Sequence, residues 1–269
     1  MRYSAYSDIL YNKSFDDLDK QIKECFYTDL GPGDLPSKRE NRKVFGIISP
    51  NSEYKYSGAC AAWAFKELAE SEFQDTYIIL GTDKNNTSCY ISTEDWETPL
   101  GKVQIDKELA NVLMSNLNFI KENNNIHKDK HEIEVQLPFL QFVSKDKLHD
   151  LKILPITIGK ITIEQMKEFA DLLESLDRQI CVIASTNLTR KEESNKKIIA
   201  AIKEMDSKEV LAALDEERQS IDSINSILTC IEISKSFGSK WARLLREYHS
   251  SKVKKDFNSA TGYAAISFE

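Results

Sequence analysis

Residues 44–70 read VFGIISPNSEYKYSGACAAWAFKELAE, and this stretch indicates an α/β fold. The run 44–48 is short, apolar and β-prone, which predicts a strand buried on both faces of a sheet. Pro50 ends the strand because proline has no N–H to donate to a sheet ladder. Ser57 is the expected N-cap of the amphipathic helix that follows. Since open α/β sheets hold their sites in loops at the carboxyl ends of strands, residues 51–54 are the first candidates for a site.

Composition and charge limit the classes of protein to which this chain can belong. The 269 residues are 41% hydrophobic and 29% charged, which is typical of a globular protein with a large core. The formal net charge is −7 and no basic stripe is present, so we expect no nucleic-acid partner. The sequence has neither a hydrophobic signal region nor an apolar run of the roughly 20 residues that span a bilayer. We therefore expect a cytoplasmic protein with no membrane partner.

The five cysteines are scattered along the chain and form no CxxC pair. An odd number without paired spacing indicates neither a disulfide framework nor a zinc ribbon. Those in apolar segments are expected to be buried free thiols. The sequence also contains no GxGxxG, Walker or GxSxG motif, so it gives no direct signal for nucleotide binding or for a serine nucleophile.

Further apolar and amphipathic runs alternate along the chain in the manner of an α/β protein. Ser14 is a candidate N-cap for a helix that begins at Phe15. Residues 121–130 are expected to be a polar loop. In the helical run 131–140, Pro138 should kink or end the hydrogen-bond ladder. The remaining expected strands are residues 76–81, 152–158, 180–186, 241–249 and 262–268, and the remaining expected helices are residues 106–115, 162–175, 193–203, 207–214 and 223–237.

Two segments give a family resemblance. Residues 50–58 (PNSEYKYSG) resemble the Pro-His-Ala-Gly-Tyr-x-Tyr-Ser-Gly signature of the MEMO family. Residues 131–140 (HEIEVQLPFL) are similar to its Glu-His-Ser-x-Glu-Val-Gln-Leu-Pro-Phe-Leu pattern. The resemblance covers essentially the whole chain. It implies a single domain over residues 1–269, with residues 1–43 as a lead-in, and a three-layer αβα sandwich with a central mixed sheet, as in LigB-like class III extradiol dioxygenases.

The resemblance also locates three positions that hold metal ligands in the family. Asn51 stands where the family has its first histidine, and Lys84 or Asn85 stands where it has the second. Asp222 stands where the family has a cysteine. An amide and an amine are poor replacements for two imidazoles, because an amine binds a metal only after losing its proton. We therefore expect no metal and no other cofactor.

The resemblance implies one cleft at the strand ends. His131 is its candidate catalytic residue, as the acid/base histidine of LigB-like enzymes; the alternative is a histidine that orients the helix start and is satisfied by Glu134 or by backbone. Thr186 matches the family's carboxylate position, and Thr189 matches a further imidazole position. The ligand-binding residues that we expect in the cleft are Asn51, Glu53, Tyr54, Asp83, Lys84, Asn85, Glu134, Thr186, Thr189 and Asp222.

Three functional hypotheses follow. The leading one is a metal-free MEMO-like pseudoenzyme that binds a small polar ligand, or a protein or peptide partner, without redox catalysis. The second is a metal-dependent oxidoreductase whose site is rebuilt from Asp222, His131 and Asp83, since carboxylates can form a hard, oxygen-rich cation site. The third is a structural subunit with a vestigial cleft.

Overall fold

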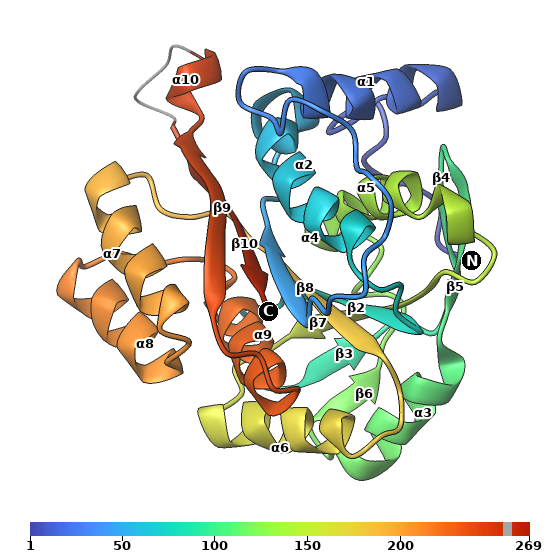
Figure 1. Ribbon diagram of the computed structural model, residues 1–269. Coiled ribbons are helices and arrows are strands. Elements are labelled where there is room, and N and C mark those ends of the chain that lie inside the picture. The colour runs from blue at the N-terminus through green and yellow to red at the C-terminus, as the bar shows by residue number, and fades with distance from the viewer. Residues whose placement is uncertain (255–259) are drawn as a thin grey trace.

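A mixed β-sheet runs through the protein, as the computed structural model shows for residues 1–254 and 260–269 (Figure 1). The described chain forms ten strands in this sheet, and the main path runs β4-β5-β7-β2-β8-β1-β10-β9, with β3 beside β7 and β6 beside β3. The strands are β1 (Gly46–Ser49), β2 (Thr76–Thr82), β3 (Cys89–Ile91), β4 (Trp96–Thr98), β5 (Gly101–Ile105), β6 (Ile120–Glu122), β7 (Lys152–Ile158), β8 (Ile180–Ser185), β9 (Ala242–His249) and β10 (Gly262–Phe268).

Helices cover both faces of the sheet, which confirms the expected three-layer αβα sandwich. Helices α1, α2, α4 and α5 pack together on one side, while α6 and α9 cover the other; α7 and α8 lie beyond β9 (Figure 1). The helices are α1 (Phe15–Tyr27), α2 (Tyr54–Glu70), α3 (Lys107–Asn116), α4 (His131–Glu134), α5 (Gln136–Val143), α6 (Ile163–Glu174), α7 (Glu192–Lys203), α8 (Ser207–Glu216), α9 (Ile224–Ser236) and α10 (Ser251–Lys254), and η1 (Lys145–Lys147) is a 3-10 turn. Among the described residues, no helix combines the length and the apolar composition that spanning a bilayer requires.

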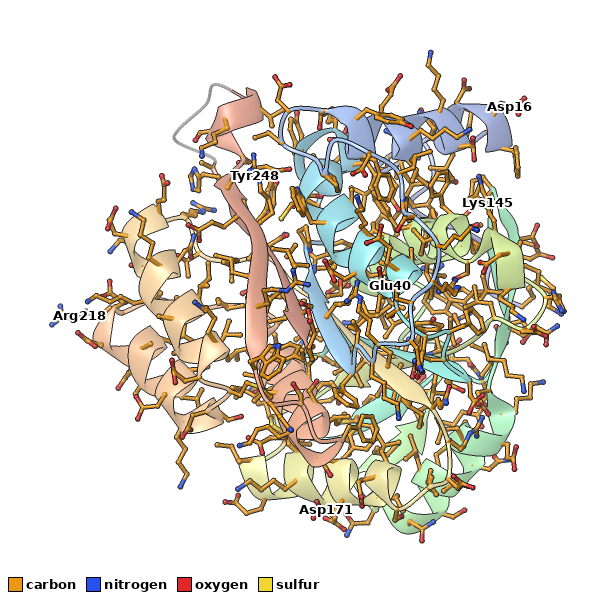
Figure 2. The ribbon with its side chains drawn as sticks, viewed as in Figure 1. Asp16, Glu40, Lys145, Asp171, Arg218 and Tyr248 are labelled. Atoms are coloured by element: carbon orange, nitrogen blue, oxygen red, sulfur yellow. The ribbon has the colours of Figure 1, made fainter. Side chains whose placement is uncertain are left out.

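The centre of the sheet is parallel and buried. Strand β8 lies between β1 and β2 and is parallel to both, while β10 pairs antiparallel with β1. Every residue of these four strands is buried, which is why their sequences read as continuous apolar runs. Charged side chains lie at the periphery, as Asp16, Asp171 and Arg218 do in Figure 2.

A glycine allows α9 to approach the sheet at β1. A Cβ atom added at Gly46 would lie 2.7 Å from Ser234 Oγ and 2.9 Å from Cys230 Sγ, both on α9. No real Cβ atom tolerates such distances without a shift of its neighbours, so the hydrogen side chain of Gly46 sets the distance between helix and strand.

Helix α2 begins four residues earlier than the sequence predicts. Its N-cap is Glu53, and Ser57 lies inside the first turn, where its hydroxyl donates to the carbonyl of Ser52 at 2.9 Å. The expected N-cap at Ser57 is therefore wrong, because its hydroxyl bonds backward within the turn instead of capping a free N–H. By contrast, Ser14 caps α1 as predicted and accepts from the N–H of Asp17 at 3.2 Å.

The helical run 131–140 is divided at Val135 into α4 and α5. Pro138 lies in the first turn of α5, where a missing N–H costs nothing within the helix. That N–H would otherwise have bonded to the carbonyl of Glu134, four residues earlier, so the ladder stops there. The predicted effect of Pro138 is confirmed.

The expected polar loop at residues 121–130 is corrected in two respects. It begins inside β6, and His127 is fully buried. Its ring Nε2 lies 2.9 Å from the carbonyl oxygen of Tyr90 and must donate to it, so the neutral ring carries its proton on Nε2. Burial lowers the pKa of His127 to about 4, and the nearby cations of Arg2 and Lys130 act in the same direction.

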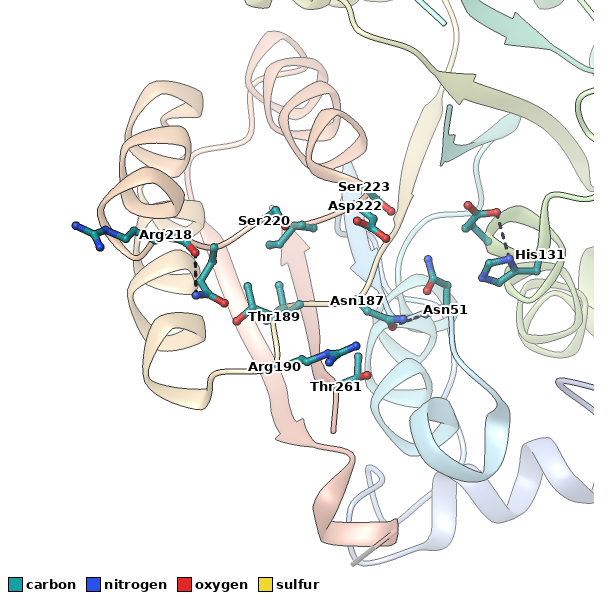
Figure 3. A pocket seen from close by; sticks show the side chains of 14 residues that line it. Asn51, His131, Asn187, Thr189, Arg190, Arg218, Ser220, Asp222, Ser223 and Thr261 are labelled. Carbon is teal, nitrogen blue, oxygen red and sulfur yellow. Dashed lines mark hydrogen bonds and ion pairs between the residues drawn. The ribbon is translucent and has the colours of Figure 1, made fainter. Parts of the chain in front are cut away.

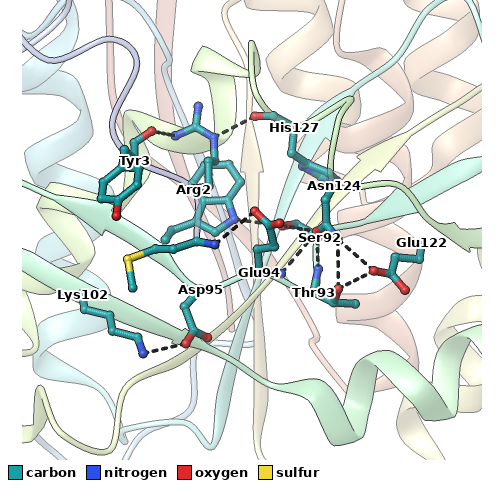
Figure 4. Close-up of polar contacts among 12 residues, drawn as sticks. Arg2, Tyr3, Ser92, Thr93, Glu94, Asp95, Lys102, Glu122, Asn124 and His127 are labelled. Carbon is teal, nitrogen blue, oxygen red and sulfur yellow. Dashed lines mark hydrogen bonds and ion pairs between the residues drawn. The ribbon is translucent and has the colours of Figure 1, made fainter.

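The N-terminal segment is anchored in the core by Arg2. Its guanidinium lies 3.9 Å from the ring centroid of Trp96 and donates to the carbonyl of His127 at 2.8 Å (Figure 4). It also lies 2.6 Å from a carboxylate oxygen of Glu134. The segment before α1 is thereby fixed against α4, the helix on which His131 lies.

Candidate functional site

A polar cleft lies where three parallel strands end. Because β2, β8 and β1 are adjacent and parallel, the loops after them meet at one edge of the sheet, the usual position of a site in such folds. The cleft has a volume of about 520 Å³ (Figure 3). Its lining residues are Asn51, His131, Glu132, Asn187, Leu188, Thr189, Arg190, Arg218, Gln219, Ser220, Ile221, Asp222, Ser223 and Thr261.

A second pocket of about 280 Å³ continues this cleft toward the N-terminal segment. Glu53 lies here, with its carboxylate 2.5 Å from the ammonium of Lys55. The residues that line both spaces are Asn51, His131, Asn187 and Thr261. These four residues therefore form the boundary between a larger and a smaller compartment.

Asn51 follows β1 directly and is only 5% exposed. Its backbone N–H donates to the side-chain oxygen of Asn187 at 3.1 Å, and the Asn187 amide donates to Ser52 Oγ at 3.0 Å. These bonds join the loops after β1 and β8. The side-chain amide of Asn51 has no hydrogen-bond partner within the described part of the chain, and in Figure 3 it points into the space between Asp222 and His131.

His131 is the first residue of α4 and faces the cleft. Its ring Nδ1 lies 3.5 Å from a carboxylate oxygen of Glu132, and its ring centroid lies 5.5 Å from that of Tyr6. Glu134, the alternative partner, turns away from the cleft. The imidazole therefore has a carboxylate on one side, an aromatic ring on another and an open face toward the cleft.

Lys84 and Asp222 form an ion pair across the cleft's outer wall. Lys84 belongs to the loop after β2, while Asp222 belongs to the segment between α8 and α9. Both side chains are more than half exposed, so the pair contributes little to stability. It brings two of the sequence-predicted positions together, and it places an ammonium group beside the Asp222 carboxylate.

No residue of the β2–β3 loop lines the cleft: Lys84 reaches it only through its ion pair with Asp222, and Asp83 and Asn85, which were also expected in the cleft, lie outside the lining. The Asp83 carboxylate accepts hydrogen bonds from the backbone N–H of Asn85 at 3.0 Å and from the Asn86 side chain at 2.6 Å. Burial alone would raise the pKa of Asp83, but these hydrogen bonds and the nearby Lys130 ammonium outweigh it and lower the pKa. Both Asp83 oxygens are thus committed to shaping their own turn.

Tyr54 and Glu134 are also outside the cleft. The Tyr54 hydroxyl is buried and donates to the carbonyl of Val135 at 2.6 Å. Glu134 has a fully buried side chain that accepts from the Tyr6 N–H at 2.8 Å and from the Tyr11 hydroxyl at 2.6 Å. Both residues join elements of the core, so expecting them in the cleft was wrong.

After β8 one of the two predicted residues lines the cleft, together with neighbours that were not predicted. Thr186 is buried and its hydroxyl donates to the carbonyl of Asn187, whereas Asn187 itself lines the cleft. Thr189 does line the cleft, but its hydroxyl donates to Asn195 at 2.7 Å. Arg190 follows it, with no hydrogen bond or ion pair for its guanidinium among the described residues. A search of the polar residues after β8 would have found both Asn187 and Arg190.

The donor set offers little to a transition metal. Within residues 1–254 and 260–269, no group of three or more His, Cys, Asp or Glu residues is placed to hold a metal ion. The trio Asp83, His131 and Asp222 is therefore not brought together, and the rebuilt site that we considered does not exist among these residues. The lining holds the His131 imidazole and the Glu132 and Asp222 carboxylates, which are not grouped around one ion, and otherwise amides, hydroxyls and guanidinium groups, which serve as hydrogen-bond donors and acceptors.

The fold and the cleft define a class of protein: a three-layer αβα sandwich with a polar cleft at the ends of its parallel strands. The crystal structure of an uncharacterized protein from Escherichia coli K12 has the same fold, with a TM-score of 0.57 at 10% identity, covering 84% of this chain and 100% of that one. The chain also matches the Memo-like protein family over residues 2–267. The chain belongs to the MEMO family.

Its relatives match over nearly their whole length. A MEMO1 family protein of Methanopyrus kandleri is 31% identical, with 99% of this chain and 98% of the relative covered. One from Methanobrevibacter smithii is 31% identical over the full length of both chains. A third, from Methanococcus maripaludis, is 31% identical with 98% of each chain covered. The correspondence of whole chains confirms the family but assigns no reaction.

Proposed function

We propose that this MEMO family protein is a binding protein: its cleft takes a small polar ligand without a transition metal and without redox chemistry. The ion pair between Lys84 and Asp222 carries the proposal. By the family resemblance, the ligands of one metal cation would come from the loop after β1, the loop after β2 and the segment at Asp222. Here the cation beside Asp222 is the ammonium of a lysine.

The chemistry of the neighbouring side chains also supports a cleft that binds its ligand without a metal. An ammonium has three donors and no lone pair, so Lys84 can bind a metal only after losing its proton and its partner carboxylate. Asn51 offers a neutral amide in place of an imidazole. These groups suit hydrogen bonding to a ligand far better than coordination of iron, copper or zinc.

Metal content of the purified protein tests the proposal. We expect protein prepared without chelators to contain iron, copper and zinc at well below one ion per chain, and adding each metal ion alone to leave its melting temperature unchanged. Stoichiometric metal that is lost in both Asp222→Ala and His131→Ala would overturn the proposal in favour of the oxidoreductase. His149→Ala is the matched control, because His149 lies on the surface, away from the cleft.

A further inference from the structure

Two arginines line the cleft, Arg190 and Arg218, and neither guanidinium has an ion-pair partner among the described residues; the side chain of Arg218 points away from the cleft in Figure 3. Of the carboxylates in the lining, Asp222 pairs with Lys84. Glu132 lies 3.5 Å from the ring of His131, and one of its buried oxygens has no hydrogen-bond partner among the described residues. Among the described lining residues, Arg190 therefore places a positive charge without a counterion at the cleft of a protein whose formal net charge is −7.

Arg190 occupies a position fixed by its backbone. Its carbonyl oxygen accepts a hydrogen bond from the ring of His249 at 2.9 Å, and the neighbouring Thr189 is held by Asn195. In Figure 3 its side chain lies beside Thr261 and reaches toward Asn187. The backbone at Arg190 is thus anchored, while its five N–H donors remain available to a ligand.

A second donor faces the same space. Asn51 is only 5% exposed, yet its side-chain amide has no hydrogen-bond partner among the described residues. The amide of Asn51 faces the open cleft, so a ligand can bond to it without breaking a hydrogen bond within the described residues. Thr261, on the boundary of both compartments, adds a hydroxyl.

We propose that the ligand of this cleft is a small anion that carries a carboxylate or phosphate group, held by the guanidinium of Arg190 and the amide of Asn51. The inference rests on the binding role proposed above and names its ligand class. A guanidinium presents two parallel N–H groups that match two oxygens of such an anion. A cation would instead be repelled by the guanidinium of Arg190, and a purely apolar ligand would leave the donors of Arg190 and Asn51 unpaired.

Titration with defined anions tests the inference. The probes are inorganic phosphate, acetate and succinate, each added alone to wild-type protein at constant ionic strength, with melting temperature and calorimetric binding as readouts. We expect at least one probe to bind saturably and to raise the melting temperature. Phosphate acting alone would identify a phosphate ligand, and acetate or succinate acting alone would identify a carboxylate.

Three variants determine where the anion binds. Arg190→Gln should weaken binding by about tenfold or more, the effect of losing one charged hydrogen bond. Arg190→Glu should abolish binding. The side chain of Arg190 is exposed, so both variants should fold with a stability within about 0.5 kcal/mol of the wild type. Lys191→Gln removes the same charge one residue away, outside the cleft lining, and should bind as the wild type does.

Two results would overturn the inference. One is the absence of saturable binding by all three probes; the other is equal weakening in Arg190→Gln and Lys191→Gln, which would reveal a general effect of charge. Either result leaves the metal content of the protein unaffected, so the failure of this inference is distinguishable from that of the binding role itself.

Discussion

The carboxylate of Glu134 lies 2.6 Å from Nη1 of Arg2, and the two form a fully desolvated ion pair beneath α4. Glu134 also accepts hydrogen bonds from the N–H groups of Ala5 and Tyr6 and from the Tyr11 hydroxyl. With these partners the buried charge is satisfied, so the pair joins the N-terminal segment to the helix that begins at His131.

Removing the charge of Glu134 should destabilise the protein strongly. Glu134→Gln leaves Arg2 buried without a counterion, and breaking such a pair costs about 3–5 kcal/mol. The free energy of unfolding, measured by urea denaturation, checks this. Glu174→Gln is the control, because Glu174 is exposed at the end of α6 and its replacement should change stability by less than about 0.5 kcal/mol. Equal effects of the two substitutions would contradict a structural role for the pair.

Stability should fall in mild acid because of His127. Its pKa is about 4 when folded and about 6.5 when unfolded, so the unfolded chain binds more protons between these values. The free energy of unfolding is therefore unaffected by His127 above about pH 6.5 and falls as the pH is lowered toward 4. The loss reaches about 2 kcal/mol at pH 5. Urea unfolding at about pH 6.5 and at about pH 5 measures this loss of stability.

His127→Gln should reduce that pH dependence, because glutamine does not titrate. The exposed His149 serves as the control, and His149→Gln should retain the pH dependence of the wild type. If the His127 variant loses as much stability in acid as the wild type, another group is responsible.

A methyl group at Gly46 should push α9 away from β1. Gly46→Ala brings a Cβ against Ser234 Oγ and Cys230 Sγ, and overpacking of this kind costs about 1–3 kcal/mol. The Ser234 hydroxyl is buried without a hydrogen-bond partner, so Ser234→Ala alone should be close to neutral. The double variant should then recover part of the loss, as thermal unfolding can measure; full additivity of the two effects would argue against this contact.

The cysteines should be unreactive in the native protein. All five are buried free thiols, as expected for those in apolar segments, and burial raises the pKa of Cys25 to about 12. Thiolates, not thiols, react with disulfide reagents, so native labelling at about pH 8 should be slow and should accelerate on addition of urea. Cys25 lines a side groove between α1 and α2 and should be labelled first. Rapid native labelling of Cys181, in the central strand β8, would contradict the fold.

Local signals predicted most of the fold. Apolar runs predicted β1, β2 and β8, and Pro50 correctly located the loop after β1. Both signals are local, because strand burial and the effect of a proline depend on a few adjacent residues. The start of α2 was misplaced, since a serine hydroxyl near a helix start can either cap it or bond backward.

The cleft was predicted less completely. Asn51, His131 and Asp222 line it as expected, but Asn187 and Arg190 were missed because the family's motif marks residues 186 and 189 instead. The role of Glu134 was unpredictable from helical spacing, which identifies a face of α4 but not the distant segment that covers it. The wall around Asp222 depends on the left-handed turn at Arg218, which has φ 51°, and nothing in the local sequence requires it.

The ion pair at Arg2 also constrains the order in which the protein can form during translation. Tyr6 leaves the ribosome 128 residues before its partner Glu134. At synthesis rates of about 5–20 residues per second, the N-terminal segment is synthesised on the order of ten seconds before Glu134, which neutralises the charge of Arg2. The opening residues of the chain therefore cannot reach their native position before α4 has been synthesised, and the part of the cleft wall that holds His131 forms no earlier than that.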